Sequence, residues 1–448
     1  MSSATIGTGS TTRPAGPDGQ WLARLPEAVL AGVTPAYVYD LAEVRRNAAA
    51  LRSALPAGSL TYYSLKANPH PVLQDCLRRE GARAEVCSPG ELDVALAAGF
   101  DPGQVLYTGP GKRDVDVDHA LRRGVREFSV DSPVGIDQVS RLAAAAGAPV
   151  RLLLRVNDDQ PARGQGLAMT GVPSQFGADT RWVLAEPHRF AGTPDARVIG
   201  LHLYMGTNLS AVGDLLAQFE QALRTAAGLR EALAGHGVRL DTFDLGGGFG
   251  APFARAGSRY DLDGLRPGLE VLLGEWVPGW RTGAVRVAFE SGRYLTGTAG
   301  ALLARVLDVK RSHGQEVVVL ESGINHLGGM SGLRRLPPLA PQLVTVGPAD
   351  VQVGTPVTKT VVAGPLCTPL DVWNRAADLP PLVPGQLLAV PNVGAYGLSA
   401  SLVAFLGHPL PVEVVVDTDR ADAVLDVSEL RLVRVAANLQ QTPSGRNH

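Results

Sequence analysis

The sequence predicts a (β/α)8 barrel followed by a mainly β domain, and three observations support this fold class. Between residues 60 and 295, short β-rich runs alternate with helical stretches rich in Ala, Leu and Arg. Eight such strand–helix units follow one another, and eight units close a barrel of about 250 residues. From about residue 301, Val-rich runs succeed one another with many Pro and Gly residues and little helix between them, which is typical of a β domain.

The barrel strands are expected where β-branched and aromatic residues gather. They are Leu60–Leu65, Arg83–Cys87, Val105–Thr108, Glu127–Val130, Val150–Val156, Arg197–Leu203, Thr242–Leu245 and Val285–Phe289. Helices are expected between them, among others at Pro71–Glu80, Pro89–Ala98, Asp114–Arg123 and Val212–Ala234. A doubly wound open sheet is the competing architecture. It gives no reason for eight units, and the dinucleotide-binding loop that it needs does not follow the first strand here.

The second domain is expected to be built from Val-rich strands. These are Leu302–Lys310, Glu316–Leu320, Val357–Ala363, Gln386–Pro391 and Val412–Val416, and Tyr37–Tyr39 could return to the domain as an extra strand. The predicted boundaries are a flexible N-terminal arm (1–36), a segment that joins the β domain and leads into the barrel (37–59), the barrel (60–300) and the β domain (301–448).

Charge and cysteine content exclude several classes of protein. The 448 residues include 41 Lys and Arg against 43 Asp and Glu, so the formal net charge is −2. Such a chain has no electrostatic basis for binding nucleic acid or an anionic membrane. Three cysteines cannot form a disulfide framework, and the first 20 residues lack the apolar run of a secretion signal. We therefore expect a cytoplasmic globular protein.

One lysine stands where a barrel places its chemistry. Functional residues of a barrel lie at the carboxyl ends of the strands, and the first expected strand leads directly into Lys66. Desolvation at the barrel mouth is expected to lower the pKa of this amine and make it a nucleophile. The plain alternative for a single lysine is a surface or salt-bridged side chain.

The last two strands end in groups that suit a phosphate and a ring nitrogen. Three consecutive glycines, Gly246, Gly247 and Gly248, follow the seventh strand, and backbone N–H groups in such a loop can approach a phosphate. The eighth strand leads into Glu290 and Arg293, a carboxylate and a guanidinium side by side. A lysine nucleophile, a phosphate cradle and an opposing carboxylate together predict a pyridoxal 5'-phosphate site. No metal site is expected.

Several motifs resemble those of the fold-type III pyridoxal phosphate decarboxylases, the family of the diaminopimelate, ornithine and arginine decarboxylases. The resemblance extends from about Tyr37 to Arg434 and rests on Tyr63-Ser64-Leu65-Lys66-Ala67-Asn68, Gly246–Gly248, Glu290-Ser291-Gly292-Arg293, Gly364-Pro365-Leu366-Cys367 and Gly394-Ala395-Tyr396. It implies a barrel plus a C-terminal β domain, assembled as a head-to-tail homodimer with shared active sites.

The resemblance also implies a role for each matching residue. Lys66 would bind the cofactor aldehyde covalently, Glu290 would pair with the ring nitrogen, and Cys367 would reach across the dimer to return a proton after CO2 leaves. The cofactor phosphate would be contacted by Gly246, Gly247, Gly248, Arg293 and Tyr396, and Gly292 would be a further cofactor contact. Glu85 would lie near Lys66, as a functional carboxylate or a plain ion pair. His202 would be a cofactor contact or simply a satisfied histidine at a strand end.

Departures from the family pattern concern the ring and the substrate. Tyr204 replaces a histidine that commonly stacks on the cofactor ring, and Thr207 replaces the usual serine that follows; an aromatic face can still stack on a pyridine. Thr368 follows the expected catalytic cysteine, where free diamino-acid decarboxylases usually carry an acid that binds the distal amine. Asp371 falls where the family often keeps an acidic residue near the substrate.

The segment from Glu321 to Arg335 resembles a sub-branch of natural-product decarboxylases, including the butirosin-pathway enzyme that acts on a glutamyl group tethered to an acyl carrier protein. On this resemblance, Arg334 or Arg335 would meet a distal carboxylate, a phosphopantetheine phosphate or the acidic surface of the carrier. Two solvated arginines before the Pro337-Pro338 turn are an equally good interpretation.

The sequence thus predicts a decarboxylase that removes the α-carboxylate of an amino acid or a carrier-tethered aminoacyl group. A free diamino-acid decarboxylase is the first alternative. A racemase or epimerase, which moves protons at Cα and retains the carboxylate, is another. A decarboxylase-like regulator without cofactor is the last, and intact Lys66, Glu290 and Cys367 argue against it.

Overall fold

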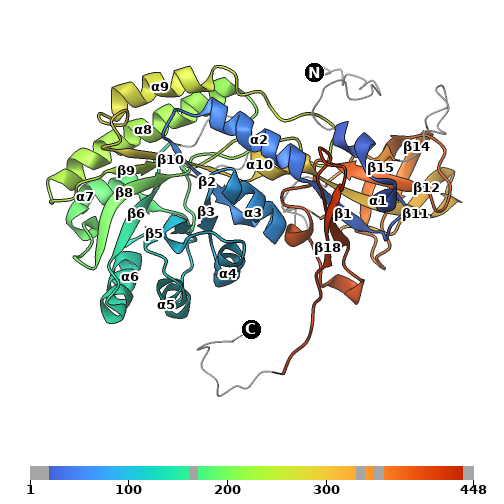
Figure 1. Ribbon diagram of the computed structural model, residues 1–448, viewed down its shortest axis with the longest axis horizontal. Coiled ribbons are helices and arrows are strands. Elements are labelled where there is room, and N and C mark those ends of the chain that lie inside the picture. Colours follow the sequence, from blue (N-terminus) through green and yellow to red (C-terminus); the bar gives the residue numbers. More distant parts are fainter. Residues whose placement is uncertain (1–19, 161–169, 329–338, 347–357, 437–448) are drawn as a thin grey trace.

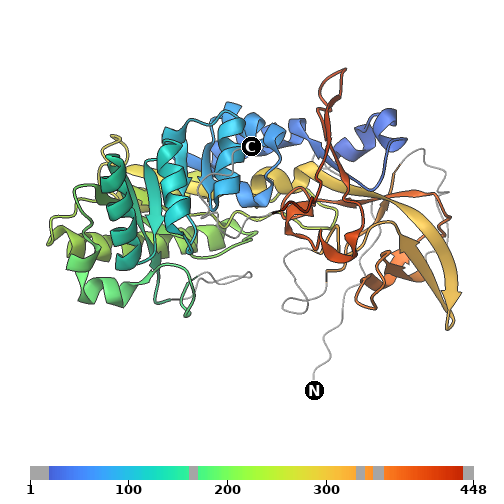
Figure 2. The same ribbon diagram turned by 90° about the horizontal axis from the view of Figure 1, so that it is seen from below.

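The computed structural model describes residues 20–160, 170–328, 339–346 and 358–436. These residues form two lobes that lie side by side along the long axis of the molecule (Figures 1 and 2). One lobe is a barrel of parallel strands surrounded by helices, and the other is built on a nine-stranded, mostly antiparallel sheet.

The barrel closes as predicted. Its strands are β2 (Leu60–Ser64), β3 (Arg83–Val86), β4 (Val105–Tyr107), β5 (Glu127–Val130), β6 (Val150–Asn157), β8 (Ala196–Leu203), β9 (Thr242–Asp244) and β10 (Arg286–Ser291). Their order is β5-β4-β3-β2-β10-β9-β8-β6, and parallel pairing of β5 with β6 completes the ring. The short strand β7 (Ala178–Asp179) pairs with the end of β6. The sequence-based prediction of a (β/α)8 barrel is confirmed.

The helices begin at sequence signals that physical chemistry explains. They are α1 (Glu27–Leu30), α2 (Leu41–Ala54), α3 (Pro71–Arg79), α4 (Pro89–Ala97), α5 (Asp114–Arg122), α6 (Pro133–Ala146), α7 (Thr180–Ala185), α8 (Val212–Ala234), α9 (Leu265–Trp276) and α10 (Arg293–Thr296). Ser88 and Ser132 cap α4 and α6, where each hydroxyl accepts a hydrogen bond from a free backbone N–H. A proline follows each cap, since the first helical position needs no N–H donor.

The second lobe contains the strands β1 (Ala36–Asp40), β11 (Gly300–Ser312), β12 (Gln315–Leu320), β13 (Val344–Thr345), β14 (Thr358–Ala363), β15 (Val372–Leu379), β16 (Leu387–Pro391), β17 (Val412–Val416) and β18 (Val424–Glu429). β1 lies between β11 and β17, so the expected return of Tyr37–Tyr39 to this domain is correct. Sequence reasoning missed β15 because Asn374 and Arg375 interrupt its apolar pattern, and it missed β18, whose side chains are largely exposed.

The flexible arm predicted for residues 1–36 is too long. Residues 20–36 form a 3-10 turn at Gln20–Arg24, helix α1 and the start of β1. Trp21 is 2% exposed, and its indole Nε1 donates a hydrogen bond to the Thr298 carbonyl at 3.0 Å. Trp21 packs in one apolar cluster with Leu25, Val29 and residues of β1, β11, β16 and β17. Burial of this indole fixes residues 20–36 on the sheet. The polar residues that precede Trp21 gave no indication of this packing.

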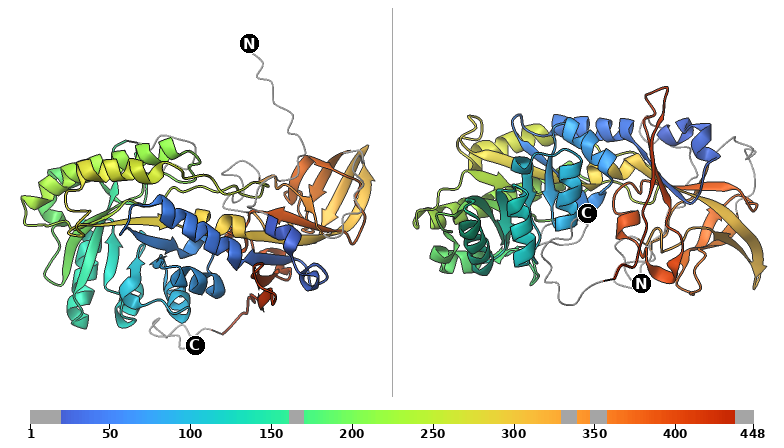
Figure 3. Two further views of the ribbon diagram at one scale, coloured as in Figure 1. Left: turned by 45° about the horizontal axis from the view of Figure 1, so that its top comes forward. Right: turned by 60° about the horizontal axis from the view of Figure 1, so that its bottom comes forward.

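Among the described residues, no helix combines the length and the apolar character needed to cross a membrane. In both views of Figure 3, most helices lie around the barrel, whereas the second lobe is mainly sheet.

Replacing Trp21 tests whether the N-terminal segment contributes to stability. Because Trp21→Ala removes a fully buried indole, we expect it to lower the free energy of unfolding by about 3–5 kcal/mol in urea denaturation. Val33→Ala is the control, since Val33 is 71% exposed and a surface substitution changes stability by about 0.5 kcal/mol or less. Equal stabilities of the two variants would contradict the packing described for this segment.

Candidate active site

The predicted cofactor residues gather at the carboxyl ends of the barrel strands. Glu85, His202 and Glu290 lie near the ends of β3, β8 and β10, respectively. Parallel strands of a closed barrel present these ends on one rim. Residues that are more than 200 positions apart in the sequence therefore share one site.

Lys66 lies in a 3-10 turn (Leu65–Ala67) that both lobes hold in place. The Tyr63 hydroxyl donates to the Asn68 carbonyl at 2.7 Å, and the Asn68 side-chain amide donates to the Gly394 carbonyl at 2.8 Å. The backbone N–H of Tyr396 donates to the Ala67 carbonyl at 2.7 Å. The β lobe thus fixes the turn that carries the lysine.

The Lys66 amine pairs with Glu85. Its Nζ lies 3.2 Å from Glu85 Oε2 and 3.4 Å from Oε1. Burial disfavours the ammonium form, but attraction to Glu85, and to Glu290 beyond it, raises the pKa of Lys66 well above its ordinary value. The expectation of a lysine with a lowered pKa is therefore wrong for the protein without its cofactor, because desolvation is outweighed by a carboxylate at contact distance.

Glu85 is a permanent anion in this arrangement. It is 1% exposed, and burial alone would favour its neutral form. The Lys66 charge and hydrogen bonds from Thr108, Ser64 and Cys87 overcome burial and lower the pKa of Glu85 to about 2. The Cys87 thiol donates to Glu85 Oε1 at 3.2 Å, and burial followed by the Glu85 charge raises the pKa of Cys87 far above its ordinary value. Cys87 is therefore a hydrogen-bond donor here and no thiolate.

The glycine loop after β9 has no room for side chains. A Cβ on Gly247 would lie 2.4 Å from the Glu290 carbonyl oxygen, and Gly248 has a φ of 106°. The side-chain amide of Gln218, on α8, donates to the Gly247 carbonyl at 2.6 Å, and the Glu290 N–H donates to the Gly246 carbonyl at 2.8 Å. Only glycine fits this close approach of loop, strand and helix.

Arg293 and Tyr396 meet beside this loop from opposite lobes. The Arg293 Cζ lies 4.6 Å from the centre of the Tyr396 ring and 5.8 Å from that of Phe253. Tyr396 adopts a φ of 56°, an uncommon conformation for a residue with a side chain. Gly292, just before the arginine, packs against the lysine turn, since a Cβ there would lie 2.7 Å from Ala67 Cβ.

Tyr204 lies over the glycine loop. A Cβ on Gly246 would be 2.8 Å from Tyr204 Cδ2, and the Arg155 Cζ lies 5.9 Å from the Tyr204 ring centre. Burial raises the pKa of Tyr204 to about 12, although Lys66 and Thr207 oppose the shift. The tyrosine is therefore a neutral aromatic face. Sequence reasoning missed Arg155 and Gln218; a strand-end arginine in β6 was the available signal for the first, and a helix offers none for the second.

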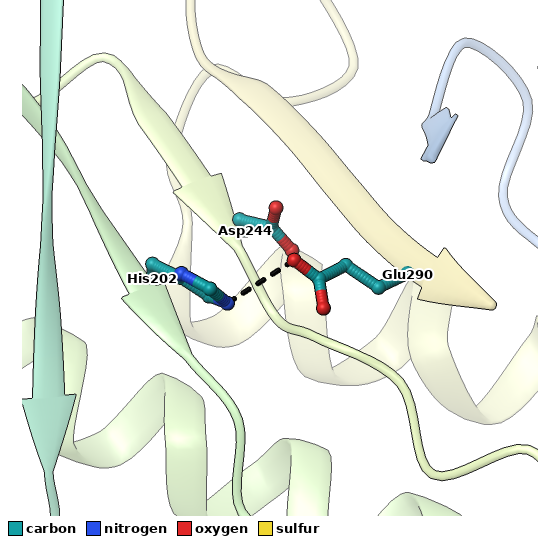
Figure 4. Close-up of side chains that lie close together, drawn as sticks. All are labelled: His202, Asp244 and Glu290. Atoms are coloured by element: carbon teal, nitrogen blue, oxygen red, sulfur yellow. Dashed lines mark ion pairs between the residues drawn. The ribbon is translucent and has the colours of Figure 1, made fainter. Parts of the chain in front are cut away.

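Three buried ionisable side chains converge below the rim (Figure 4). His202, Asp244 and Glu290 are at most 2% exposed. A ring nitrogen of His202 and one carboxyl oxygen of each acid lie within 4.8 Å of one another. His202 Nε2 is 3.2 Å from Glu290 Oε1, while its Nδ1 is 2.8 Å from the Ser129 hydroxyl. Sequence analysis did not include Asp244, although its position directly before the glycine loop was a usable signal.

The residues predicted to act from the β lobe differ from one another in their exposure and contacts. Cys367 is exposed, and Thr368 follows it on the same loop. Asp371 is 2% exposed, and its two oxygens accept hydrogen bonds from the N–H groups of Ile324 and Leu366, each at 2.8 Å. Asp371 therefore organises the cysteine loop, and the substrate contact predicted for it stays a prediction. Arg334 and Arg335 lie outside the described residues.

The residues present fit pyridoxal phosphate. Glu290 Oε1 is buried and has no hydrogen-bond partner among the described residues, as expected of an atom that awaits a ring N–H. The side-chain-free glycine loop suits a phosphate, and Arg293 adds a cation. Lys66 supplies a primary amine at the rim. Fold and site together define a barrel enzyme of the pyridoxal phosphate class.

Comparison with known proteins identifies the family. Residues 41–297 match the model of the pyridoxal-binding domain of pyridoxal-dependent decarboxylases. The chain belongs to this family, and it is a pyridoxal-dependent amino acid decarboxylase.

Relatives and solved structures agree over most of the chain. The L-glutamyl-[BtrI acyl-carrier protein] decarboxylase of Niallia circulans is 30% identical over 85% of this chain and 88% of its own length. A diaminopimelate decarboxylase of Actinosynnema pretiosum is 34% identical over 81% of this chain and 79% of its own. The crystal structure of Helicobacter pylori diaminopimelate decarboxylase with L-lysine shares the fold, with a TM-score of 0.75, 23% identity and coverage of 88% and 94%.

Glu85→Gln tests the electrostatic coupling at Lys66. Removal of the anion leaves desolvation less opposed, so the pKa of Lys66 falls and the amine becomes reactive at lower pH. Reductive methylation of the cofactor-free protein, followed residue by residue by mass spectrometry across pH, measures this shift. Lys310, which is exposed and remote from Glu85 in the second lobe, is the internal standard. An unchanged profile for Lys66 would refute the coupling.

Proposed function

We propose that this chain decarboxylates an aminoacyl group, with pyridoxal 5'-phosphate as cofactor and an acyl carrier protein as the bearer of the substrate. The observation that carries the catalytic part is the Lys66 amine 3.2 Å from the Glu85 carboxylate, on the same rim as the glycine loop and Glu290. An amine, a phosphate cradle and a buried carboxylate are the three groups that this cofactor requires.

The chain's own residues divide the task of holding the cofactor. Lys66 would bind the aldehyde carbon, and Glu290 would hold a proton at the ring nitrogen. Backbone N–H groups of the glycine loop, with Arg293 and Tyr396, bind the phosphate. Tyr204, a neutral aromatic ring above the loop, covers one face of the pyridine. His202 contacts the Glu290 carboxylate. Thr207 forms a side-chain hydrogen bond with Tyr204.

When bound, the cofactor accepts the electron pair that the departing CO2 leaves at Cα. Glu290 keeps that sink effective, because its negative charge stabilises the protonated ring nitrogen. Glu85 receives hydrogen bonds from Lys66 and Thr108 and so keeps the amine oriented on the rim. Cys367 of the partner subunit returns the proton to Cα.

A homodimer with shared active sites is supported by exposed groups on the second lobe. Cys367 is exposed within the protomer, so a second copy is needed if it is to work in a closed site. The edge strand β18 and the residues after it, which extend away from the body in Figure 1, carry a row of exposed apolar side chains: Val424, Leu425, Val427, Leu430, Leu432, Val433 and Val435. Such an edge requires a partner.

The carrier-tethered substrate is supported by the residue after the cysteine and by a relative. Thr368 has no charge with which to bind a distal amine of a free diamino acid. The Niallia circulans relative acts, as its name says, on a glutamyl group of a carrier protein. Arg334 and Arg335 are proposed to meet the distal carboxylate or the carrier. The diaminopimelate decarboxylases at similar identity favour the second candidate, a free diamino acid.

A reducing compartment such as the cytoplasm is proposed from the thiols. Cys76, Cys87 and Cys367 are all free, and free thiols persist where disulfides do not form.

Measurement of CO2 release decides the substrate. Purified protein with pyridoxal phosphate is given carrier-loaded glutamate, free glutamate and free diaminopimelate, and we expect CO2 from the loaded carrier alone. Lys66→Ala should abolish both turnover and the visible absorbance of the bound cofactor. Release of CO2 from diaminopimelate would favour the second candidate. Exchange of the Cα proton with retention of the carboxylate would indicate a racemase and refute the proposal.

Val427→Asp tests the dimer. Val427 is 62% exposed on β18, and a buried, unpaired charge at an apolar interface is strongly unfavourable. We expect the variant to sediment as a monomer and to lose activity. Val271→Asp is the matched control, because Val271 is 69% exposed on α9 of the barrel. A dimeric Val427→Asp variant, or a monomeric wild type, would contradict the interface.

A further inference from the structure

The buried cluster of His202, Asp244 and Glu290 contains two carboxyl groups but only one basic side chain. The three side chains come from the adjacent strands β8, β9 and β10, and His202 and Asp244 stand opposite each other in the register of β8 and β9. Exposure is 1%, 0% and 2%, respectively. Two carboxyl groups that lie this close together and are shielded from water cannot both ionise without a large electrostatic cost.

The His202 imidazole is at contact distance from Glu290, whereas Asp244 has no basic side chain at that distance among the described residues. His202 Nε2 lies 3.2 Å from Glu290 Oε1. Asp244 Oδ1 accepts a hydrogen bond from the Gly246 N–H at 2.9 Å, and Asp244 Oδ2 has no hydrogen-bond partner among the described residues. One carboxyl oxygen of Asp244 lies within 4.8 Å of an oxygen of Glu290 and of a ring nitrogen of His202. The free oxygen of the less supported carboxyl is therefore the best place for a proton.

We propose that Asp244 is a positioning residue that remains a neutral carboxylic acid at working pH and leaves Glu290 as the single anion of this cluster. Its O–H faces the Glu290 carboxylate and orients it. The proposal deepens the proposed function, on which it rests for the role of Glu290 toward the ring nitrogen. Asp244 itself touches neither cofactor nor substrate in this scheme.

The electrostatic surroundings of Asp244 agree with a retained proton. Burial, with the Glu290 charge and a smaller effect of Glu85, raises the pKa of Asp244 to about 7, while His202 and the Gly246 N–H oppose the shift. Tyr62, on β2, is the other titratable group that the Asp244 charge influences. An unfolded aspartate loses its proton near pH 4. Between these values the folded chain binds one more proton than the unfolded chain, so stability must fall as pH rises.

Asp244→Asn is the decisive variant because asparagine imitates the neutral acid. Its carbonyl oxygen can still accept from the Gly246 N–H, and its amide can still donate toward Glu290. In the cofactor-free protein, we expect the unfolding temperature of the wild type to fall between pH 4 and 7 more steeply than that of Asp244→Asn. Glu290→Gln should flatten the profile too, since it removes the charge that holds the proton on Asp244.

Asp241→Asn is the matched control for this profile. It makes the same substitution at a half-buried residue directly before β9, outside the buried cluster, and should retain the wild-type slope. An Asp244→Asn profile as steep as that of the wild type would overturn the proposal.

Cofactor affinity gives a second readout, independent of turnover. Titration of the cofactor-free protein with pyridoxal phosphate, followed by absorbance, should give Asp244→Asn an affinity within about threefold of the wild type. Asp244→Leu has a similar size but no donor, and loss of a hydrogen bond to a charged group should weaken binding about tenfold or more. Equal weakening by Asn and Leu would mean that the aspartate anion is required, which refutes a neutral Asp244. Failure of the proposed function would appear differently, as a wild type that releases no CO2.

Discussion

Closure of the barrel by the pairing of β2 with β10 is the constraint on which the site depends. A closed parallel sheet aligns all eight strand ends on one rim, so that β2 and β10, the first and last barrel strands in the sequence, become neighbours. Glu290 is thereby paired with Tyr62, four residues before Lys66. An open sheet would leave the lysine and the carboxylate at opposite edges.

The rim is an electrostatic arrangement in two layers. At the rim, the exposed Lys66 and the buried Glu85 form an ion pair whose members stabilise each other's charge. Below it, Glu290 is buried with His202 and Asp244 and has an oxygen without a partner. Such an uncompensated buried group is costly to fold, and under the proposed function a bound ring nitrogen would supply the missing donor. In that scheme, the unpaired Glu290 oxygen lowers the stability of the cofactor-free protein and contributes to binding of the cofactor.

The β lobe contributes to the barrel site through backbone as much as through side chains. Tyr396 and Gly394 bond to the lysine turn, and Asp371 bonds to the loop that carries Cys367. This explains why the Gly364–Cys367 and Gly394–Tyr396 motifs accompany the lysine motif in one chain. A single catalytic lobe would leave both Lys66 and Arg293 without the contacts that orient them.

The sequence by itself determined the eight barrel strands, most of the β lobe and the identities of Lys66, Glu290 and the three glycines, because strand periodicity and strand-end motifs are local signals. Only the tertiary structure decided the raised pKa of Lys66, the packing of Trp21, the structural role of Asp371 and the convergence of Asp244 on Glu290. Each of these depends on atoms from distant strands that meet in a low-dielectric interior. No local sequence pattern predicts the protonation states or the packing that result when such atoms come together.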